Sequence, residues 1–224
     1  GTDIYNSGVN YNVLCRKVKD VARASASLSM LDQHVTDLLD REVGCLPRII
    51  ALYGATYTPH EFAHSLCLPG DYVAMTSFTH HPFGSKFALE TPDNRFGDTF
   101  LNLPIDTLMK RIVQSLQSGH AVCWEGDTSE AGFRFAEGRA TMPEGTKATQ
   151  EERQRLFDRR QTTDDHCMEL CGLARDRKGQ RFFIAKNSWG KGNRYKGFMY
   201  LSDDYVRLKT IAVYMRMPIE PPNQ

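Results

Sequence analysis

The sequence predicts an α+β protein in which helices come first and an antiparallel sheet follows. Three observations support this fold class. Apolar residues recur at helical spacing over residues 12–43. The end of the chain contains several strand-like runs, and Asp176-Arg177-Lys178-Gly179 is a strong turn signal between two of them. Helices followed by strands, without regular alternation, are typical of α+β folds.

The helices have recognisable boundaries. Residues 12–43 are predicted to be helical, with Gly44 as a plausible stop. A second helix is predicted to begin at Thr58, with Pro59 in the first helical position and Glu61 completing a capping box. An amphipathic helix over residues 107–117 and a short polar helix over residues 151–160 complete the set.

Strands are expected at residues 72–76, 87–89, 120–124, 166–174, 181–186, 198–201 and 210–217. Residues 128–148 hold several glycines and charges, and they are predicted to form an irregular insertion. The chain is therefore expected to have two parts, a helical segment over residues 1–70 and an antiparallel β-rich domain over residues 71–224.

Composition excludes several classes of function. The net charge of +1 gives no indication of a nucleic-acid partner or a membrane surface. No apolar run reaches the length of a transmembrane helix, and no signal-peptide pattern opens the sequence. We expect a cytoplasmic protein, with a periplasmic or secreted location left open because Gly1 indicates a start made by processing or cloning.

Three motifs near the C-terminus carry the candidate chemistry: Asp165-His166-Cys167, Lys186-Asn187-Ser188-Trp189-Gly190 and Gly197-Phe198-Met199-Tyr200-Leu201. If Asp176 pairs with Gly179 across the turn, His166 lies two residues from the position opposite Asn187. The two side chains are then diagonal neighbours on one face, within reach of a hydrogen bond. A one-residue bulge is expected to move them to opposite faces.

An asparagine that holds a histidine fixes the orientation and tautomer of the imidazole without taking its proton. The other ring nitrogen can then serve a nucleophile. A thiol is the natural partner, because imidazolium stabilises the thiolate. A lone Asp-His on a strand is usually structural, so the prediction depends on the motifs occurring in this order across one hairpin.

In this order the motifs resemble those of papain-superfamily cysteine peptidases. Asn187-Ser188-Trp189-Gly190 is similar to the family's asparagine motif, and His166 matches the histidine before it. The resemblance implies a papain-like fold and a Cys-His-Asn triad in which His166 and Asn187 are catalytic. It also implies that Trp189 shields their hydrogen bond and that Asp165 tunes the ion pair.

Upstream segments resemble the bleomycin hydrolase and aminopeptidase C branch of this superfamily. They are Pro59-His60-Glu61-Phe62, Asp71-Tyr72-Val73, Leu103-Pro104-Ile105-Asp106 and residues 120–127. The resemblance implies a peptide substrate and no cofactor. Because the tail after Ile219 is short, the choice between exopeptidase and endopeptidase stays open.

No segment matches the family's nucleophile, a cysteine followed by tryptophan and preceded by glutamine and glycine at a helix start. Cys123 precedes Trp124 but lies in an apolar strand, and Cys15 lacks the tryptophan and the glutamine. We therefore expect a nucleophile domain on an upstream segment or another chain, and a fragment that is inactive alone. An exposed interface for that domain also favours a homo-oligomer.

Three further cysteines and two alternative functions complete the predictions. Cys67, Cys167 and Cys171 are expected to be small buried hydrophobic residues. One alternative is a non-catalytic binding or scaffold protein built on a peptidase fold. The other is a metal hydrolase that uses His60, His64 and the His80-His81 loop, although no third ligand is evident and no metal site is expected.

Overall fold

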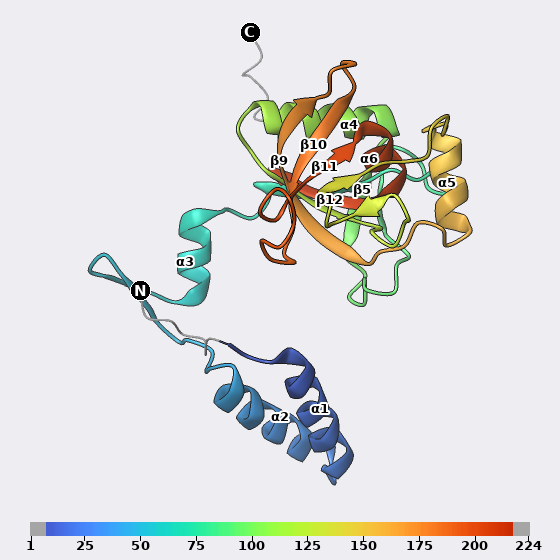
Figure 1. The fold of residues 1–224 in the computed structure, drawn as a ribbon. Helices are drawn as coiled ribbons and strands as arrows, with labels where there is room; N and C mark the ends of the chain where they lie inside the picture. The colour runs from blue at the N-terminus through green and yellow to red at the C-terminus, as the bar shows by residue number, and fades with distance from the viewer. Residues whose placement is uncertain (1–7, 217–224) are drawn as a thin grey trace. The chain divides into compact units, whose positions relative to one another are not determined.

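The computed structural model describes residues 8–216 and divides the chain into two compact units, Gly1–Leu68 and Pro69–Gln224 (Figure 1). Each unit has its own helices and strands. The predicted α+β class is confirmed. The predicted end of the last strand, Met217, lies outside the described residues.

The first unit begins with two helices, α1 (Tyr11–Ala24) and α2 (Leu28–Glu42), where a single helix was predicted. Ser25 ends α1 in an extended conformation. The side chain of Ser27 then accepts a backbone N–H from the first turn of α2 at 3.3 Å. Serine hydroxyls favour helix ends over helix interiors, which explains the break.

A short hairpin of β1 (Ile50–Leu52) and β2 (Ala55–Tyr57) follows, and it was not predicted. The helix α3 (Pro59–Leu66) confirms the predicted capping box. Thr58 Oγ1 accepts the Glu61 N–H at 3.2 Å, and Glu61 Oε2 accepts the Thr58 N–H at 2.7 Å. The two bonds satisfy backbone donors that the helix itself leaves free.

The second unit is built on one sheet in the order β4-β5-β3-β12-β6-β9-β10-β11-β8-β7. Its strands are β3 (Tyr72–Thr76), β4 (Lys86–Ala88), β5 (Thr99–Asn102), β6 (Val122–Gly126), β7 (Phe133–Arg134), β8 (Arg139–Ala140), β9 (His166–Arg175), β10 (Arg181–Lys186), β11 (Phe198–Ser202) and β12 (Thr210–Arg216). Neighbours are antiparallel except for the β3–β5 and β8–β11 pairs. The two short strands β7 and β8 lie inside residues 128–148, which were predicted to be irregular.

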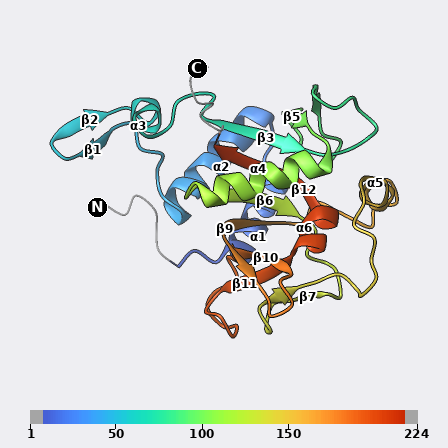
Figure 2. The ribbon, with the colours of Figure 1, turned by 90° about the horizontal axis from the view of Figure 1, so that it is seen from above.

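Three helices accompany the sheet: α4 (Ile105–Gln117), α5 (Gln150–Asp158) and α6 (Asp203–Lys209). Figure 2 shows α4 lying along the sheet, where it contacts β6, β9 and β12. Leu108 and Ile112 of α4 are fully buried in the main core against the sheet residues Trp124 and Leu170. None of the helices in the described part of the chain is long and apolar enough to cross a bilayer.

The β9–β10 connection is longer than predicted. Arg175 pairs with Arg181, so the predicted pairing of Asp176 with Gly179 is wrong. Asp176 Oδ1 accepts the backbone N–H groups of Lys178 and Gln180, both at 2.8 Å. An aspartate that caps its own turn in this way stabilises the wider loop.

A bulge then corrects the register of the hairpin. Gly172 lies opposite Ile184, but Leu170 lies opposite Ala185, which leaves Cys171 as the extra residue of β9. Because side chains alternate along a strand, this one-residue shift exchanges the faces of everything before it. The expectation that a bulge would separate His166 from Asn187 is therefore wrong, since the bulge brings them to one face.

Candidate active site

His166 and Asn187 form the centre of the candidate site. His166 opens β9, where it pairs with Gly126, and Asn187 directly follows β10. The Nε2 atom of His166 lies 2.8 Å from Oδ1 of Asn187. Because an amide oxygen can only accept, Nε2 carries the proton and Nδ1 is the unprotonated nitrogen of the neutral ring. This tautomer leaves Nδ1 able to exchange a proton with another group.

Asn187 makes two hydrogen bonds besides the one to His166. Its side chain is 7% exposed, and its amide Nδ2 donates to Met199 Sδ at 3.6 Å. Its backbone N–H donates to the carbonyl of Gly197 at 3.0 Å. Gly197 has a φ of 96°, and a Cβ there would lie 2.9 Å from the carbonyl oxygen of Gly190. Only glycine fits at this point, which explains the glycine in the third motif.

Asn193 is a residue of the site region that the sequence did not single out. Its Oδ1 accepts the backbone N–H groups of Tyr195 at 3.1 Å and Gly197 at 2.6 Å, and its Nδ2 donates to the Phe198 carbonyl at 2.8 Å. It thus shapes the loop that returns to Asn187. The dipeptide Gly192-Asn193 was the available signal, because glycine and asparagine favour tight turns.

Trp189 packs against the imidazole of His166, with ring centroids 4.8 Å apart. Phe133 and Phe135 meet the same indole edge to face, at 5.5 Å and 5.3 Å. These contacts supply aromatic packing beside the histidine. Trp189 is still 48% exposed, so one side of the indole faces solvent in this chain.

Asp165 points toward a neighbouring loop. Its Oδ1 accepts the backbone N–H of Thr128 at 2.8 Å and the Thr128 hydroxyl at 2.9 Å. The Thr163 hydroxyl donates to its Oδ2 at 3.3 Å. The carboxylate therefore anchors the chain just before His166 to the loop after β6.

The cysteines are not buried as expected. Cys167 and Cys171 are exposed and Cys67 is half-buried, so the prediction for all three is wrong. Cys123 and Cys167 lie on the sheet face opposite to the buried side chains of β6 and β9. Partial burial and the charge of Glu125 raise the pKa of Cys123, and the same two causes raise that of Cys167 to about 11. Neither thiol is activated, since a nucleophilic cysteine needs a lowered pKa.

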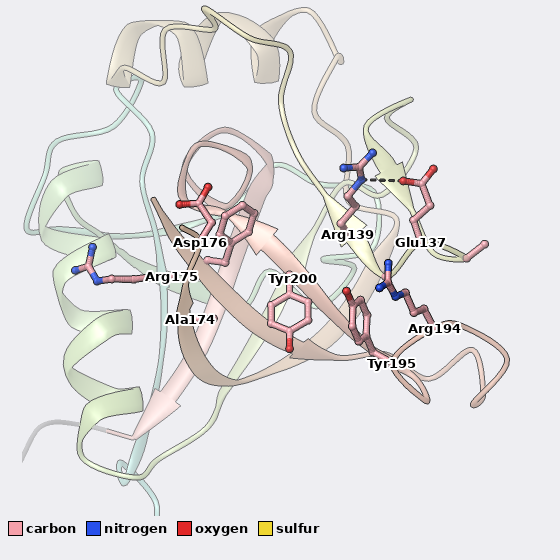
Figure 3. Close-up of a pocket in the computed structure, with 11 residues that line it drawn as sticks. Glu137, Arg139, Ala174, Arg175, Asp176, Arg194, Tyr195 and Tyr200 are labelled. Atoms are coloured by element: carbon pink, nitrogen blue, oxygen red, sulfur yellow. Dashed lines mark ion pairs between the residues drawn. The ribbon is translucent and has the colours of Figure 1, made fainter. Parts of the chain in front are cut away.

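Two hollows of similar size open on the second unit. One, of about 610 Å³, is bordered by Asn187, Ser188, Cys167 and Tyr214, so it reaches Asn187, but His166 does not border it. The other, of about 600 Å³, involves neither His166 nor Asn187 and is lined by arginine and tyrosine side chains that include Arg139, Arg194, Tyr195 and Tyr200 (Figure 3). Neither hollow is bordered by His166, so neither is assigned to a substrate.

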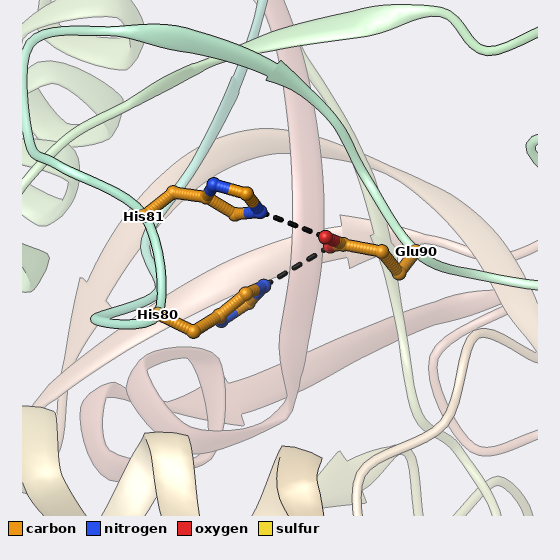
Figure 4. Close-up of side chains that lie close together, drawn as sticks. All are labelled: His80, His81 and Glu90. Carbon is orange, nitrogen blue, oxygen red and sulfur yellow. Dashed lines mark hydrogen bonds and ion pairs between the residues drawn. The ribbon is translucent and has the colours of Figure 1, made fainter.

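The histidines of the metal hypothesis fall into two groups. His60 and His64 lie exposed on α3, with ring centroids 6.3 Å apart. His80 Nε2 and His81 Nε2 lie 3.0 Å and 2.7 Å from the two oxygens of Glu90 (Figure 4). Two imidazoles and a carboxylate are a ligand set that metals accept.

The surroundings of His80 favour a hydrogen-bonded cluster over a metal site. Gln154 Oε1 accepts the Thr79 N–H at 2.5 Å, so the amide nitrogen of Gln154 faces His80 Nδ1 at 3.0 Å. His80 Nδ1 must therefore accept, and Nε2 must carry the proton that it donates to Glu90. A metal at Nε2 would need that proton on Nδ1, where it would meet a second donor.

A mostly antiparallel sheet that presents a hydrogen-bonded histidine and asparagine at the ends of two adjacent inner strands, with an aromatic ring over the histidine, is typical of the papain-like class of fold. The chain belongs to the Peptidase C1-like family, whose model matches residues 54–216. The resemblance predicted from the motifs is thereby confirmed.

Two relatives illustrate the similarity. Aminopeptidase G from Lactobacillus delbrueckii subsp. lactis is 28% identical over 152 residues, which are 61% of this chain and 33% of that protein. The crystal structure of PepW from Lactobacillus rhamnosis HN001 matches 94% of this chain and 55% of its own, with 19% identity and a TM-score of 0.65. The chain thus spans about a third and about half of the lengths of these two relatives.

Proposed function

We propose that this chain supplies the histidine and asparagine of a cysteine peptidase of the aminopeptidase type, and that the attacking thiol comes from outside the chain. The observation that carries the proposal is the 2.8 Å contact between His166 Nε2 and Asn187 Oδ1. It selects the tautomer in which Nδ1 is the free base. This is the arrangement that a thiol nucleophile requires of its imidazole partner.

The mechanism follows from that tautomer. Nδ1 of His166 takes the proton of the incoming thiol, and the resulting imidazolium stabilises the thiolate. The thiolate attacks a peptide carbonyl, and His166 returns the proton to the leaving amine, which gives an acyl-enzyme. Asn187 keeps the ring in place throughout and exchanges no proton.

The chain's own cysteines near the site do not suit the role of nucleophile. The raised pKa values of Cys123 and Cys167 keep both thiols protonated at neutral pH. Cys15 lies exposed on α1 in the other unit. A nucleophile domain is therefore the proposed partner, together with a peptide substrate and a second copy of the assembled enzyme.

The experiment compares the chain alone with the chain joined to a segment that carries the family's cysteine–tryptophan helix. The readout is the release of a fluorescent amine from aminoacyl and peptidyl substrates. The joined protein should show thiol-dependent turnover, which His166→Ala should lower by about 10²–10⁴-fold, the usual share of a general acid–base group. His64→Ala, an exposed histidine in the other unit, is the matched control and should leave turnover unchanged.

Two results contradict the proposal in different ways. Turnover by the chain alone that Cys15→Ser abolishes places the nucleophile inside this chain. A joined protein that binds peptides without cleaving them supports the scaffold alternative.

A further inference from the structure

We infer that Lys209 is a positioning residue for His166, acting through Asp127 and the loop of residues 127–130. Its bearing on catalysis rests on the proposed function, but the structural link does not. The sequence motifs gave no indication of this role, because Lys209 lies 43 positions after His166 and outside all three motifs.

Lys209 is a buried cation. It ends α6, its residue is 0% exposed, and its Nζ donates to the Gln161 carbonyl at 2.6 Å. The same Nζ forms an ion pair with Glu130 Oε1 and lies 3.6 Å from Asp127 Oδ2. A buried ammonium is stable only when anions and hydrogen bonds compensate it, so the lysine and the loop carboxylates depend on one another.

Asp127 joins this cation to the segment that precedes the histidine. The carboxylate is 1% exposed, and its Oδ1 accepts the Ser129 N–H at 2.8 Å and the Ser129 hydroxyl at 2.7 Å. Its Oδ2 accepts the N–H of Thr163 at 3.2 Å. The carbonyl of Asp127 accepts the hydroxyl of the buried Tyr205 at 2.7 Å. Asp127 is thus fixed on every polar atom of its side chain.

The next residue of the loop reaches the catalytic histidine's neighbour. Thr128 donates its backbone N–H and its hydroxyl to Asp165 Oδ1, at 2.8 Å and 2.9 Å. Asp165 precedes His166, whose ring must stay within hydrogen-bond distance of Asn187. Two polar links, Lys209 to Asp127 and Thr128 to Asp165, together with the peptide bonds that join Asp127 to Thr128 and Asp165 to His166, therefore connect the lysine to the histidine.

The test measures the tautomer of neutral His166 in the whole chain by long-range ¹H–¹⁵N correlation. Lys209→Met removes the positive charge and keeps a side chain of similar length. Asp127 and Glu130 then lose their cationic partner, and we expect the loop of residues 127–130 to shift because the two carboxylates repel each other. The ratio of Nε2–H to Nδ1–H tautomer should fall by about two- to tenfold, the range that loss of one ordinary hydrogen bond allows. Thr128→Val, at the accessible end of the path, should lower the ratio in the same direction but by less.

Arg153→Met is the matched control. Arg153 is also a 0% exposed cation of the second unit, but it bonds the carbonyls of Ser77 and Arg207, at 2.7 Å and 2.9 Å, and not the 127–130 loop. It should lower the melting temperature and leave the tautomer ratio unchanged.

An unchanged ratio in folded Lys209→Met and in Thr128→Val overturns the inference, as does an equal fall in Arg153→Met. If Lys209→Met does not fold, Thr128→Val decides the question. The measurement needs no nucleophile, so failure of the proposed peptidase activity leaves it intact, and a negative tautomer result leaves the peptidase proposal standing.

Discussion

Replacing Asn187 with alanine tests how strongly the amide holds the imidazole. The change removes the hydrogen bond to His166 Nε2 and the weak contact to Met199 Sδ. It keeps the bond from the backbone N–H to the Gly197 carbonyl. The perturbation is therefore confined to the side chain that sets the tautomer.

The magnitude follows from the burial of the two partners. A hydrogen bond of this kind contributes about 0.5–1.5 kcal/mol net. His166 is half-buried, so water can satisfy its freed N–H and the full cost of an unpaired buried donor does not apply. We expect the free energy of unfolding to fall by about 0.5–1.5 kcal/mol and the Nε2–H to Nδ1–H ratio to fall by about two- to tenfold.

The assay combines urea unfolding with the tautomer measurement. Both tryptophans, Trp124 and Trp189, lie in the second unit, so their fluorescence reports unfolding of the unit that holds the site. Ser188→Ala changes the exposed neighbour and should stay within about 0.5 kcal/mol of the wild type. A loss of stability in Asn187→Ala with an unchanged tautomer ratio would refute the reasoning, because the amide would then only fill space.

Three further predictions concern pH, backbone and capping. Burial and the neighbouring Asp164 raise the pKa of Glu125 to about 7. The stability that its protonated form contributes is therefore complete below the unfolded pKa near 4.5 and is lost as the pH rises through about 7. Glu125→Gln should make the melting temperature vary less with pH between pH 5 and 8, and an unchanged variation contradicts this. Gly197→Ala should lower the free energy of unfolding in urea by at least about 1–2 kcal/mol, because residue 197 has a positive φ and lies close to the Gly190 carbonyl. A loss below about 0.5 kcal/mol, the usual size of a neutral change, argues against backbone strain at this position. Thr58→Ala should destabilise α3 by about 1 kcal/mol through loss of the capping box, seen as faster amide exchange in its first turn; equal exchange in both proteins would mean that the cap is redundant.

The sequence predicted those features that depend on local chemistry. Local hydrogen bonding and backbone sterics determine the capping box at Thr58, the strand before Asn187 and the glycine at position 197. The break between α1 and α2 was missed because apolar periodicity continued across two serines. The short helix α6 was missed because its residues, Asp203–Lys209, resemble a polar turn, although it carries the buried Lys209.

The register of the β9–β10 hairpin shows why the site could be predicted for a partly wrong reason. The expected pairing at the turn was off by one residue, and the bulge at Cys171 compensated for it. Neither the longer turn nor the bulge can be predicted from the sequence, because a bulge depends on how β9 pairs with both β6 and β10. The exposed cysteines were missed for a similar reason, since an apolar strand does not reveal which face is covered.

The most direct test of the account is the protonation of the His166 ring in the unmodified chain at a pH where the ring is neutral. A long-range ¹H–¹⁵N spectrum should show one dominant tautomer, with the proton on Nε2 and Nδ1 free. A dominant Nδ1–H signal, or an even mixture of the two tautomers, would contradict the claim that Asn187 prepares this imidazole for a thiol.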